Sequence, residues 1–180
     1  MSSKLRPYQC KEITSEEIKN IQDIIQNDPN RAYFKLRNMI KNDKFDFSTG
    51  ESGAVFWGTS MHRKTNNMKI AQGWAQANGK TILEQTSGGK VLEKLDLFTE
   101  EFGFAKAAKL WNMASTNFAL GASGNINVFN TGANRFGEWG ERTWWRIEKP
   151  VLLRNDAVDS VTRRRRRQDG MPAKTGHIKK

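Results

Sequence analysis

Apolar residues recur at helical spacing in the first part of the chain. Four isoleucines follow the polar run Thr14-Ser15-Glu16-Glu17, which has the pattern of a capping box and predicts a helix start: Ile18, Ile21, Ile24 and Ile25. Asn27-Asp28-Pro29 ends this helix and begins a second one, whose apolar stripe is Tyr33, Leu36 and Ile40. These two helices predict an N-terminal helical part over residues 1–53, which ends in a loop at 43–53.

The pattern then alternates between helical and extended segments. It predicts helices over 60–78, 90–95 and 100–120, and strands over 80–83, 125–129 and 144–147, with a possible extension of the last strand at 151–153. Strands that alternate with helices favour parallel pairing. We therefore expect an α/β (α+β) fold, in which N-terminal helices accompany a small, mostly parallel sheet flanked by helices. We expect residues 54–162 to form the second part of the same compact domain and to contain any catalytic site.

The positive charge of the chain is concentrated at its C-terminus. The net charge is +11, of which +7 falls in residues 163–180 and +4 in the remainder. Five consecutive arginines at 163–167 predict a flexible, solvated basic tail. Phosphate contact needs little besides charge, so this tail also supports an alternative function as a nuclease or RNA-binding domain.

Several chemistries are disfavoured by the residue content. His62 and His177 are too few for a histidine-based metal site, and we expect none. Cys10 is the single cysteine, so no internal disulfide forms. Gly88-Gly89-Lys90 does not match a phosphate-binding loop. No apolar run reaches the length of a membrane span, and the N-terminus lacks the apolar core of a secretory signal.

Tryptophans and glutamates remain as candidate functional residues. Glu84 and Glu148 each follow a predicted strand, and the carboxyl ends of parallel strands meet at one edge of a sheet, where ligands bind. Trp57 and Trp111 are core residues or walls of a pocket. Trp144 and Trp145, adjacent in a predicted strand, point to opposite faces, so at most one belongs to the core side.

At these residues the chain resembles the ADP-ribosyl cyclase / NAD glycohydrolase family. Phe56-Trp57-Gly58 resembles the family's Phe-Trp-Ser motif, and Leu83-Glu84-Gln85-Thr86, with Glu93 nine positions after Glu84, resembles its Leu-Glu-Asp-Thr segment. The stretch from Leu110-Trp111 through Ser115 to Phe118-Ala119 is similar to a family helix. Thr143 to Glu148 resembles Thr-Phe-Gly-Ser-Val-Glu. The resemblance covers residues 55–153 in order.

The resemblance implies cleavage of the bond between nicotinamide and ribose in NAD or NADP, the substrates, without a cofactor. It implies that Glu148 is the catalytic carboxylate and that Glu84 tunes hydrolysis against cyclisation. Trp57 and Trp111 would sandwich the nicotinamide, and Ser115 and Thr143 would touch ribose or phosphates. The remaining substrate-binding candidates are Gly58, Thr59, Glu93 and Trp144. Flat aromatic faces and carboxylates suit this chemistry, because the departing ring is a cation.

The chain also departs from the family. It lacks the cysteines that staple the secreted animal enzymes, and Thr59 replaces a motif arginine, which puts pyrophosphate binding there in doubt. A compact, disulfide-free version fits a bacterial toxin (effector) domain that is secreted or delivered by a bacterium and acts in the target-cell cytoplasm. Its partner would be an acidic cognate immunity protein. Membrane binding is not expected, and nucleic acid is an unlikely ligand. A non-enzymatic interaction module is a third interpretation.

Overall fold

The computed structural model describes residues 12–58, 67–130, 143–164 and 176–178. A five-stranded sheet lies at its centre in the order β2-β1-β3-β4-β5. The strands are β1 (Ala54–Trp57), β2 (Thr81–Ile82), β3 (Gly124–Phe129), β4 (Val158–Arg164) and β5 (Gly176–Ile178). The pairings among β2, β1, β3 and β4 are parallel, and β5 is antiparallel to β4. The expected α/β fold with a mostly parallel sheet is confirmed.

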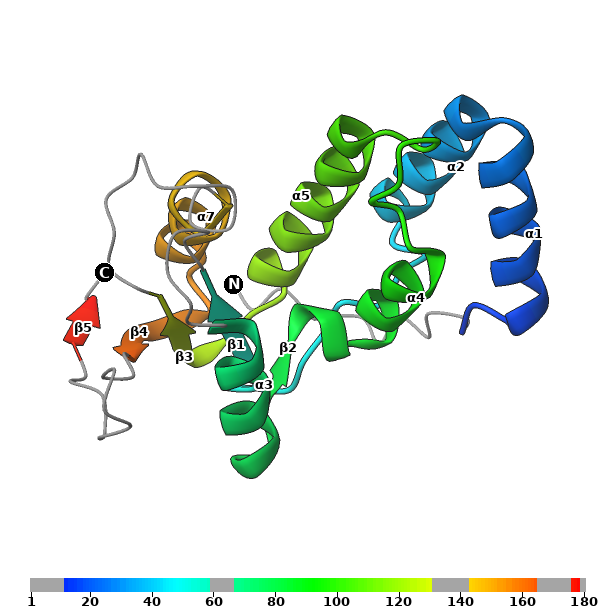
Figure 1. The fold of residues 1–180 in the computed structure, drawn as a ribbon. Helices are drawn as coiled ribbons and strands as arrows, with labels where there is room; N and C mark the ends of the chain where they lie inside the picture. Colours follow the sequence, from blue (N-terminus) through cyan, green and yellow to red (C-terminus); the bar gives the residue numbers. More distant parts are fainter. Residues whose placement is uncertain (1–11, 59–66, 131–142, 165–175, 179–180) are drawn as a thin grey trace.

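The first two helices form as their sequence predicts. Thr14 and Glu17 make a reciprocal capping box at the start of α1 (Ser15–Asn27), and the Asp28 side chain caps α2 (Pro29–Lys41) by accepting from the Arg31 amide. These helices lie at the end of the molecule opposite to β5 (Figure 1). Their buried side chains belong to the same hydrophobic core as side chains of the sheet, so residues 12–53 are part of one packed unit with the strands.

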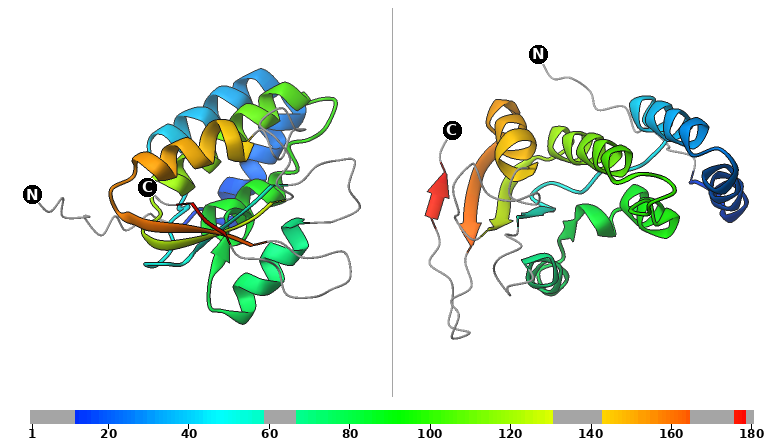
Figure 2. Two further views of the ribbon diagram at one scale, coloured as in Figure 1. Left: turned by 90° about the vertical axis from the view of Figure 1, so that its left-hand side faces the viewer. Right: turned by 45° about the horizontal axis from the view of Figure 1, so that its top comes forward.

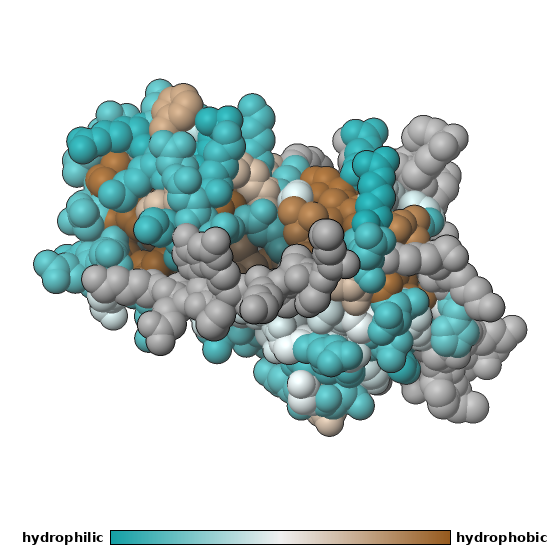
Figure 3. All heavy atoms as spheres, turned by 180° about the vertical axis from the view of Figure 1, so that it is seen from behind, coloured by the Kyte–Doolittle hydropathy of each residue, from teal (hydrophilic) through white to brown (hydrophobic). Residues whose placement is uncertain are grey.

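Helices cover both faces of the sheet. Figure 2 shows α3 (Asn67–Ala77) on one face and α5 (Phe104–Leu120) with α7 (Lys149–Arg154) on the other. Phe56, Ile126 and Val128 point into the large core on the α5 side, and Val55 and Phe129 point into a smaller core under α3. The side chains alternate between faces along each strand, as the pleat of a sheet requires. The face opposite to that of Figure 1 shows hydrophobic patches bordered by hydrophilic side chains (Figure 3).

The helix and strand boundaries differ from the expected ones at several places. Strand β2 is short because a 3-10 turn, η1 (Leu83–Gln85), begins at Leu83, and α4 spans Ser87–Leu95. Helix α5 begins at Phe104, after Gly103 with a positive φ of 98°. The first part of the predicted helix over 60–78 lies outside the described residues. No helix in the described part of the chain is both long enough and apolar enough to cross a bilayer.

The predictions of a strand over 144–147 and of its extension at 151–153 are wrong, because both segments are helical. Trp144–Glu148 form a π-helical turn, η2, which continues directly into α7. The aromatic and β-branched residues of this segment favour a strand, but the segment is helical and continues through Pro150, the second residue of α7. Trp144 is fully buried against Phe56, with ring centroids 6.1 Å apart, so tertiary packing decides the local structure.

The basic tail does not begin at residue 163. Arg163 and Arg164 are the last residues of β4, paired in register with Val128 and Phe129, and residues 176–178 return to the sheet as β5. The expectation of a solvated arm from 163 onward is therefore wrong for these residues. Strand β4 was not predicted because its last residues belong to the arginine run. Its apolar residues Val158 and Val161 lie in the core.

Candidate active site

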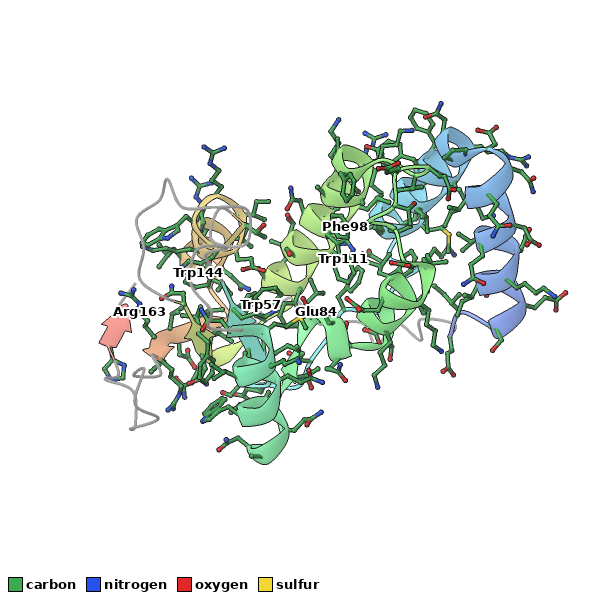
Figure 4. The ribbon with its side chains drawn as sticks, in the orientation of Figure 1. Trp57, Glu84, Phe98, Trp111, Trp144 and Arg163 are labelled. Carbon is green, nitrogen blue, oxygen red and sulfur yellow. The ribbon has the colours of Figure 1, made fainter. Side chains whose placement is uncertain are left out.

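A cavity of about 240 Å³ lies at the carboxyl edge of the sheet, between β1, η1, α5 and η2. Figure 4 shows Trp57, Glu84 and Trp111 grouped together there, from three different elements. Aromatic and aliphatic side chains make most of its wall, and two carboxylates lie in it. Its lining is Val55, Phe56, Trp57, Met68, Leu83, Glu84, Glu93, Phe98, Ala108, Trp111, Asn112, Ser115, Phe118, Thr143 and Glu148.

Trp57 and Glu84, which both line the cavity, are joined by a hydrogen bond. Trp57 ends β1, and its indole Nε1 donates to both carboxyl oxygens of Glu84, at 3.1 and 3.2 Å. Burial raises the pKa of Glu84, whereas a backbone hydrogen bond and the indole lower it, and Glu93 raises it slightly. The indole thus fixes the carboxyl group and favours its charged form.

The backbone around Glu84 is held by the start of α4. Thr86 donates its hydroxyl to the carbonyl of Leu83 at 2.6 Å and accepts from the amide of Gly89 at 3.0 Å. A Cβ at Gly89 would lie 1.9 Å from the Leu83 carbonyl oxygen and 2.9 Å from Cα of Glu84. Glycine at this position therefore lets α4 press directly against the turn that carries Glu84.

Glu148 is the most deeply buried carboxylate in the cavity. It ends η2 and is 6% exposed. Burial and then the neighbouring charge of Glu84 raise the pKa of Glu148 to about 8, while a hydrogen bond from Ser115 lowers it. Its Oε2 is buried and has no hydrogen-bond partner among the described residues. Buried polar atoms are normally hydrogen-bonded, so a water molecule or a ligand is the expected partner of this oxygen.

One face of α5 forms the opposite wall. Trp111, Asn112 and Ser115 lie within one turn and line the cavity together. Thr143 Oγ1 donates to Asn112 Oδ1 at 3.4 Å, which links this face to the turn before Glu148. Asn112 was not predicted as a site residue. It lies three residues before Ser115, and this helical spacing places both side chains on the same face.

Glu93, Phe98 and Met68 also line the cavity. Phe98 is 49% exposed and lies 6.4 Å from Phe104, centroid to centroid. Burial, followed by the charge of Asp96, raises the pKa of Glu93. No periodic or motif signal pointed to Phe98 or Met68, because each reaches the cavity only through the fold.

The cavity brings together most of the residues selected from the sequence, and the exceptions are informative. Trp57, Glu84, Glu93, Trp111, Ser115, Thr143 and Glu148 all line it. Trp144 does not: its side chain is fully buried in the core beneath the site. Gly58 is buried outside the lining, where its amide donates to the Phe129 carbonyl at 2.8 Å. Thr59 lies outside the described residues.

The route by which Glu148 reaches the site also differs from the expected one. Both glutamates were expected at one edge because each follows a predicted strand, but a helical turn, not a strand, carries Glu148 there. The described residues contain no cluster of three or more His, Cys, Asp or Glu side chains that could hold a metal ion.

Replacing Trp57 by phenylalanine is expected to raise the pKa of Glu84 further. The Trp57→Phe substitution keeps an aromatic wall but removes the N–H that both oxygens of Glu84 accept. The pKa of Glu84 can be followed by NMR of its carboxyl carbon, in a Glu148→Gln background so that one member of the pair titrates alone. An unchanged pKa after the substitution would mean that the indole does not stabilise the charged carboxylate.

No family model and no curated protein matches the sequence. Solved structures do match. Porcine CD38, complexed with a covalent intermediate, ribo-F-ribose-5'-phosphate, aligns with a TM-score of 0.56 and 17% identity over 88% of this chain and 73% of its own. Aplysia cyclase, complexed with substrate NGD and product cGDPR, aligns with a TM-score of 0.53 and 15% identity over 88% and 79%. The fold is that of the ADP-ribosyl cyclases.

Within this ADP-ribosyl cyclase fold, the cavity has a defined chemical preference. Trp57 and Trp111 contribute aromatic rings to its lining, and Glu84 and Glu148 contribute carboxyl groups. A flat cation gains from both, since aromatic faces and carboxylates each attract positive charge. Among the described residues that line the cavity, none is cationic and would compete for this position.

Proposed function

We propose that the protein cleaves the bond between nicotinamide and ribose in NAD or NADP, as an NAD(P) glycohydrolase with ADP-ribosyl cyclase-like activity. The observation that carries the proposal is the convergence of Glu84 and Glu148 with Trp57 and Trp111 in one cavity. The similarity of the fold to porcine CD38 and Aplysia cyclase supports it. The pyridinium ring of NAD is the flat cation that such a cavity prefers.

The proposed reaction begins with the nicotinamide ring between the two tryptophans. The bond between C1' of the ribose and the ring nitrogen breaks, and its electron pair moves to the nitrogen, which leaves nicotinamide neutral. Positive charge then develops on the ribose, where the carboxylate of Glu148 stabilises it. Attack by water at C1' gives ADP-ribose and a proton. Because the departing ring is already a cation, neither a proton donor nor a cofactor is required.

The other lining residues have supporting roles in this proposal. Ser115 donates a hydrogen bond to Glu148, which holds the carboxylate in place and favours its charged form. Glu84, fixed by Trp57, faces the nicotinamide and influences whether water or the adenine of the substrate attacks C1'. Thr143 and Asn112, which contact each other and line the cavity, would bind ribose hydroxyls in this proposal.

Incubation of the purified protein with NAD or NADP tests the proposal. Chromatography is expected to show nicotinamide together with ADP-ribose, its cyclic form or their phosphorylated counterparts, and the product ratio separates hydrolysis from cyclisation. The same preparation is incubated with RNA and DNA in parallel. Degraded nucleic acid with intact NAD would instead support the nuclease alternative.

The efficiency kcat/KM for NAD is expected to rise with pH, to reach half of its plateau at about pH 8 and to level off about one unit higher. The pKa of Glu148 is raised to about 8, so in the free protein this carboxyl is protonated at pH 6 and ionised at pH 9. Only the ionised form stabilises the cationic ribose, and kcat/KM reports the free enzyme, so its value at pH 7 should be about 10-fold below the plateau. The apparent pKa seen in kcat should be lower, because the bound pyridinium favours the ionised carboxylate.

Measurement of kcat and kcat/KM between pH 6 and 9, with stability checked at each pH, tests this expectation. A value of kcat/KM that is flat or falls across this range would show that ionisation of Glu148 does not limit the reaction.

We further propose a biological setting for this activity: a bacterial toxin domain, delivered by the producing cell, that depletes NAD in the cytoplasm of a target cell. A single cysteine fits a protein that folds without disulfides, and the net charge of +11 fits an acidic immunity protein as its inhibitor. Induced expression in a bacterium should lower the cellular NAD content before growth stops. Growth arrest with a normal NAD content would contradict this setting.

A further inference from the structure

Two consecutive arginines end β4 at the same edge of the sheet as the cavity. The strand register places Trp57 beside Phe129 and Phe129 beside Arg164. Adjacent strands are about 4.8 Å apart, so the backbone of Arg164 is about 10 Å from that of Trp57. Figure 4 shows Arg163 at the end of β4, on the side of Trp57 away from Glu84.

The guanidinium of Arg164 is held in place by two neutral partners, so its positive charge is not offset by them. Its Nε donates to Oδ1 of the buried Asn127 at 2.8 Å, and its guanidinium lies 4.4 Å from the centroid of the Trp74 ring. Asn127 and Trp74 orient the group but are neutral. None of the interactions that Arg164 makes with other described residues is with a carboxylate. A guanidinium fixed in this way suits an anion that presents two neighbouring oxygens, such as a phosphate group.

Arg163 is oriented in a similar manner on the other face of the sheet. Its Nε donates to Oδ1 of Asn130, which is 5% exposed and directly follows β3. Adjacent strand residues point to opposite faces, so the two arginines flank the edge from both sides. In each case the guanidinium donates one of its five N–H groups to a buried asparagine at or near the end of β3, which fixes its position.

The charge along this edge is therefore asymmetric. Glu84 and Glu93 lie at the α4 end, in and around the cavity, and the arginines lie at the β4 end. A ligand with a cationic ring and an anionic remainder gains most when its ring enters the cavity and its anion extends toward β4. The reverse orientation would place the anion beside two carboxylates.

We propose that Arg163 and Arg164 form an anion subsite, which binds the phosphate groups of the same dinucleotide whose cationic ring occupies the cavity. This inference rests on the proposed function and assigns a location to the phosphate end of the substrate. The subsite lies outside the cavity lining, and its residues act by binding and orienting the substrate.

Substitution of Arg164 by glutamine tests the subsite by two independent readouts. Arg164→Gln is expected to weaken the binding of ADP, measured by calorimetry, by roughly 10- to 100-fold, the usual effect of losing a hydrogen bond to a charged group. The KM for NAD should rise by a similar factor with kcat largely retained. Cleavage of nicotinamide riboside, which has the same cation but no phosphate, should be unchanged. Arg154→Gln, which removes an exposed arginine before the start of β4, is the matched control and should change neither value.

The outcomes separate the subsite from the activity. Arginine-dependent binding of ADP by a wild-type protein that does not cleave NAD would retain the subsite and reject the proposed function. Unchanged binding of ADP and unchanged KM for NAD in Arg164→Gln would reject the subsite, as would a wild-type protein that does not bind ADP. An equal loss with nicotinamide riboside would indicate general damage to the site and would also reject it.

Two further arms complete the test. Because Arg164 packs on Trp74, Arg164→Gln is checked by thermal unfolding, and Arg163→Gln on the opposite face provides a second variant with the same expected results. A single-stranded RNA oligonucleotide is titrated in parallel. If the arginine substitutions weaken RNA binding and leave ADP binding intact, the arginines serve RNA and the subsite proposal is wrong.

Discussion

A Glu148→Gln variant is expected to release nicotinamide from NAD about 100- to 1000-fold more slowly than the wild-type protein. Glutamine keeps the size of the side chain and an oxygen that accepts from Ser115, but it cannot carry the negative charge that faces the ribose in the transition state. The fold should be retained, because burial already keeps Glu148 largely neutral in the empty cavity at neutral pH. The measurement is kcat at saturating NAD.

The matched control is Glu100→Gln, which makes the same chemical change at an exposed glutamate before α5 and outside the cavity lining. It should have wild-type turnover, and circular dichroism should show that both variants are folded. A folded Glu148→Gln protein with wild-type kcat would exclude Glu148 as the catalytic residue.

A Gly89→Ala variant is expected to be destabilised by about 1–3 kcal/mol or more, the usual effect of inserting a methyl group into packed structure. The added Cβ would meet the backbone of Leu83 at 1.9 Å, and a backbone cannot rotate away as a side chain can. Either α4 or the turn with Glu84 must move. NAD cleavage should therefore also fall in the fraction that remains folded, because Glu84 would lose its position beside Trp57.

Gly73→Ala is the matched control for this substitution. Gly73 lies inside α3, and a Cβ there would meet nothing within 4 Å. Alanine is the better helix former, so this variant should be as stable as the wild type or up to about 1 kcal/mol more stable. Urea denaturation of the three proteins gives the comparison. Equal stability of Gly89→Ala and wild type would mean that α4 does not pack against the Leu83 turn as described.

The sequence was sufficient for features that depend on local chemistry. The capping box at Thr14, the helix start at Pro29 and the strand over 125–129 all form where the pattern predicts them. The candidate site was also largely predictable, because its residues occur in an ordered set of short motifs. Trp57, Trp111, Glu84 and Glu148 meet in one cavity, although each taken alone was as consistent with a core or surface role.

Features that depend on tertiary packing were not predictable. The segment from Trp144 to Glu148 has the composition of a strand, yet it forms a π-helical turn because Trp144 is buried beneath the site. Arg163 and Arg164 look like the start of a solvated run, yet buried asparagines more than 30 residues away in the chain hold them in β4. The sequence around each arginine does not indicate which asparagine it will contact, and the same holds for the asparagines.

The most direct test of the central claim is the amount of nicotinamide that the purified wild-type protein releases from NAD, measured beside Glu148→Gln at the same concentration. We expect many turnovers per molecule of wild-type protein, and at least about 100-fold fewer by the variant over the same time. The account would be contradicted if the wild-type protein released no nicotinamide from NAD or NADP, or if the variant released as much as the wild type.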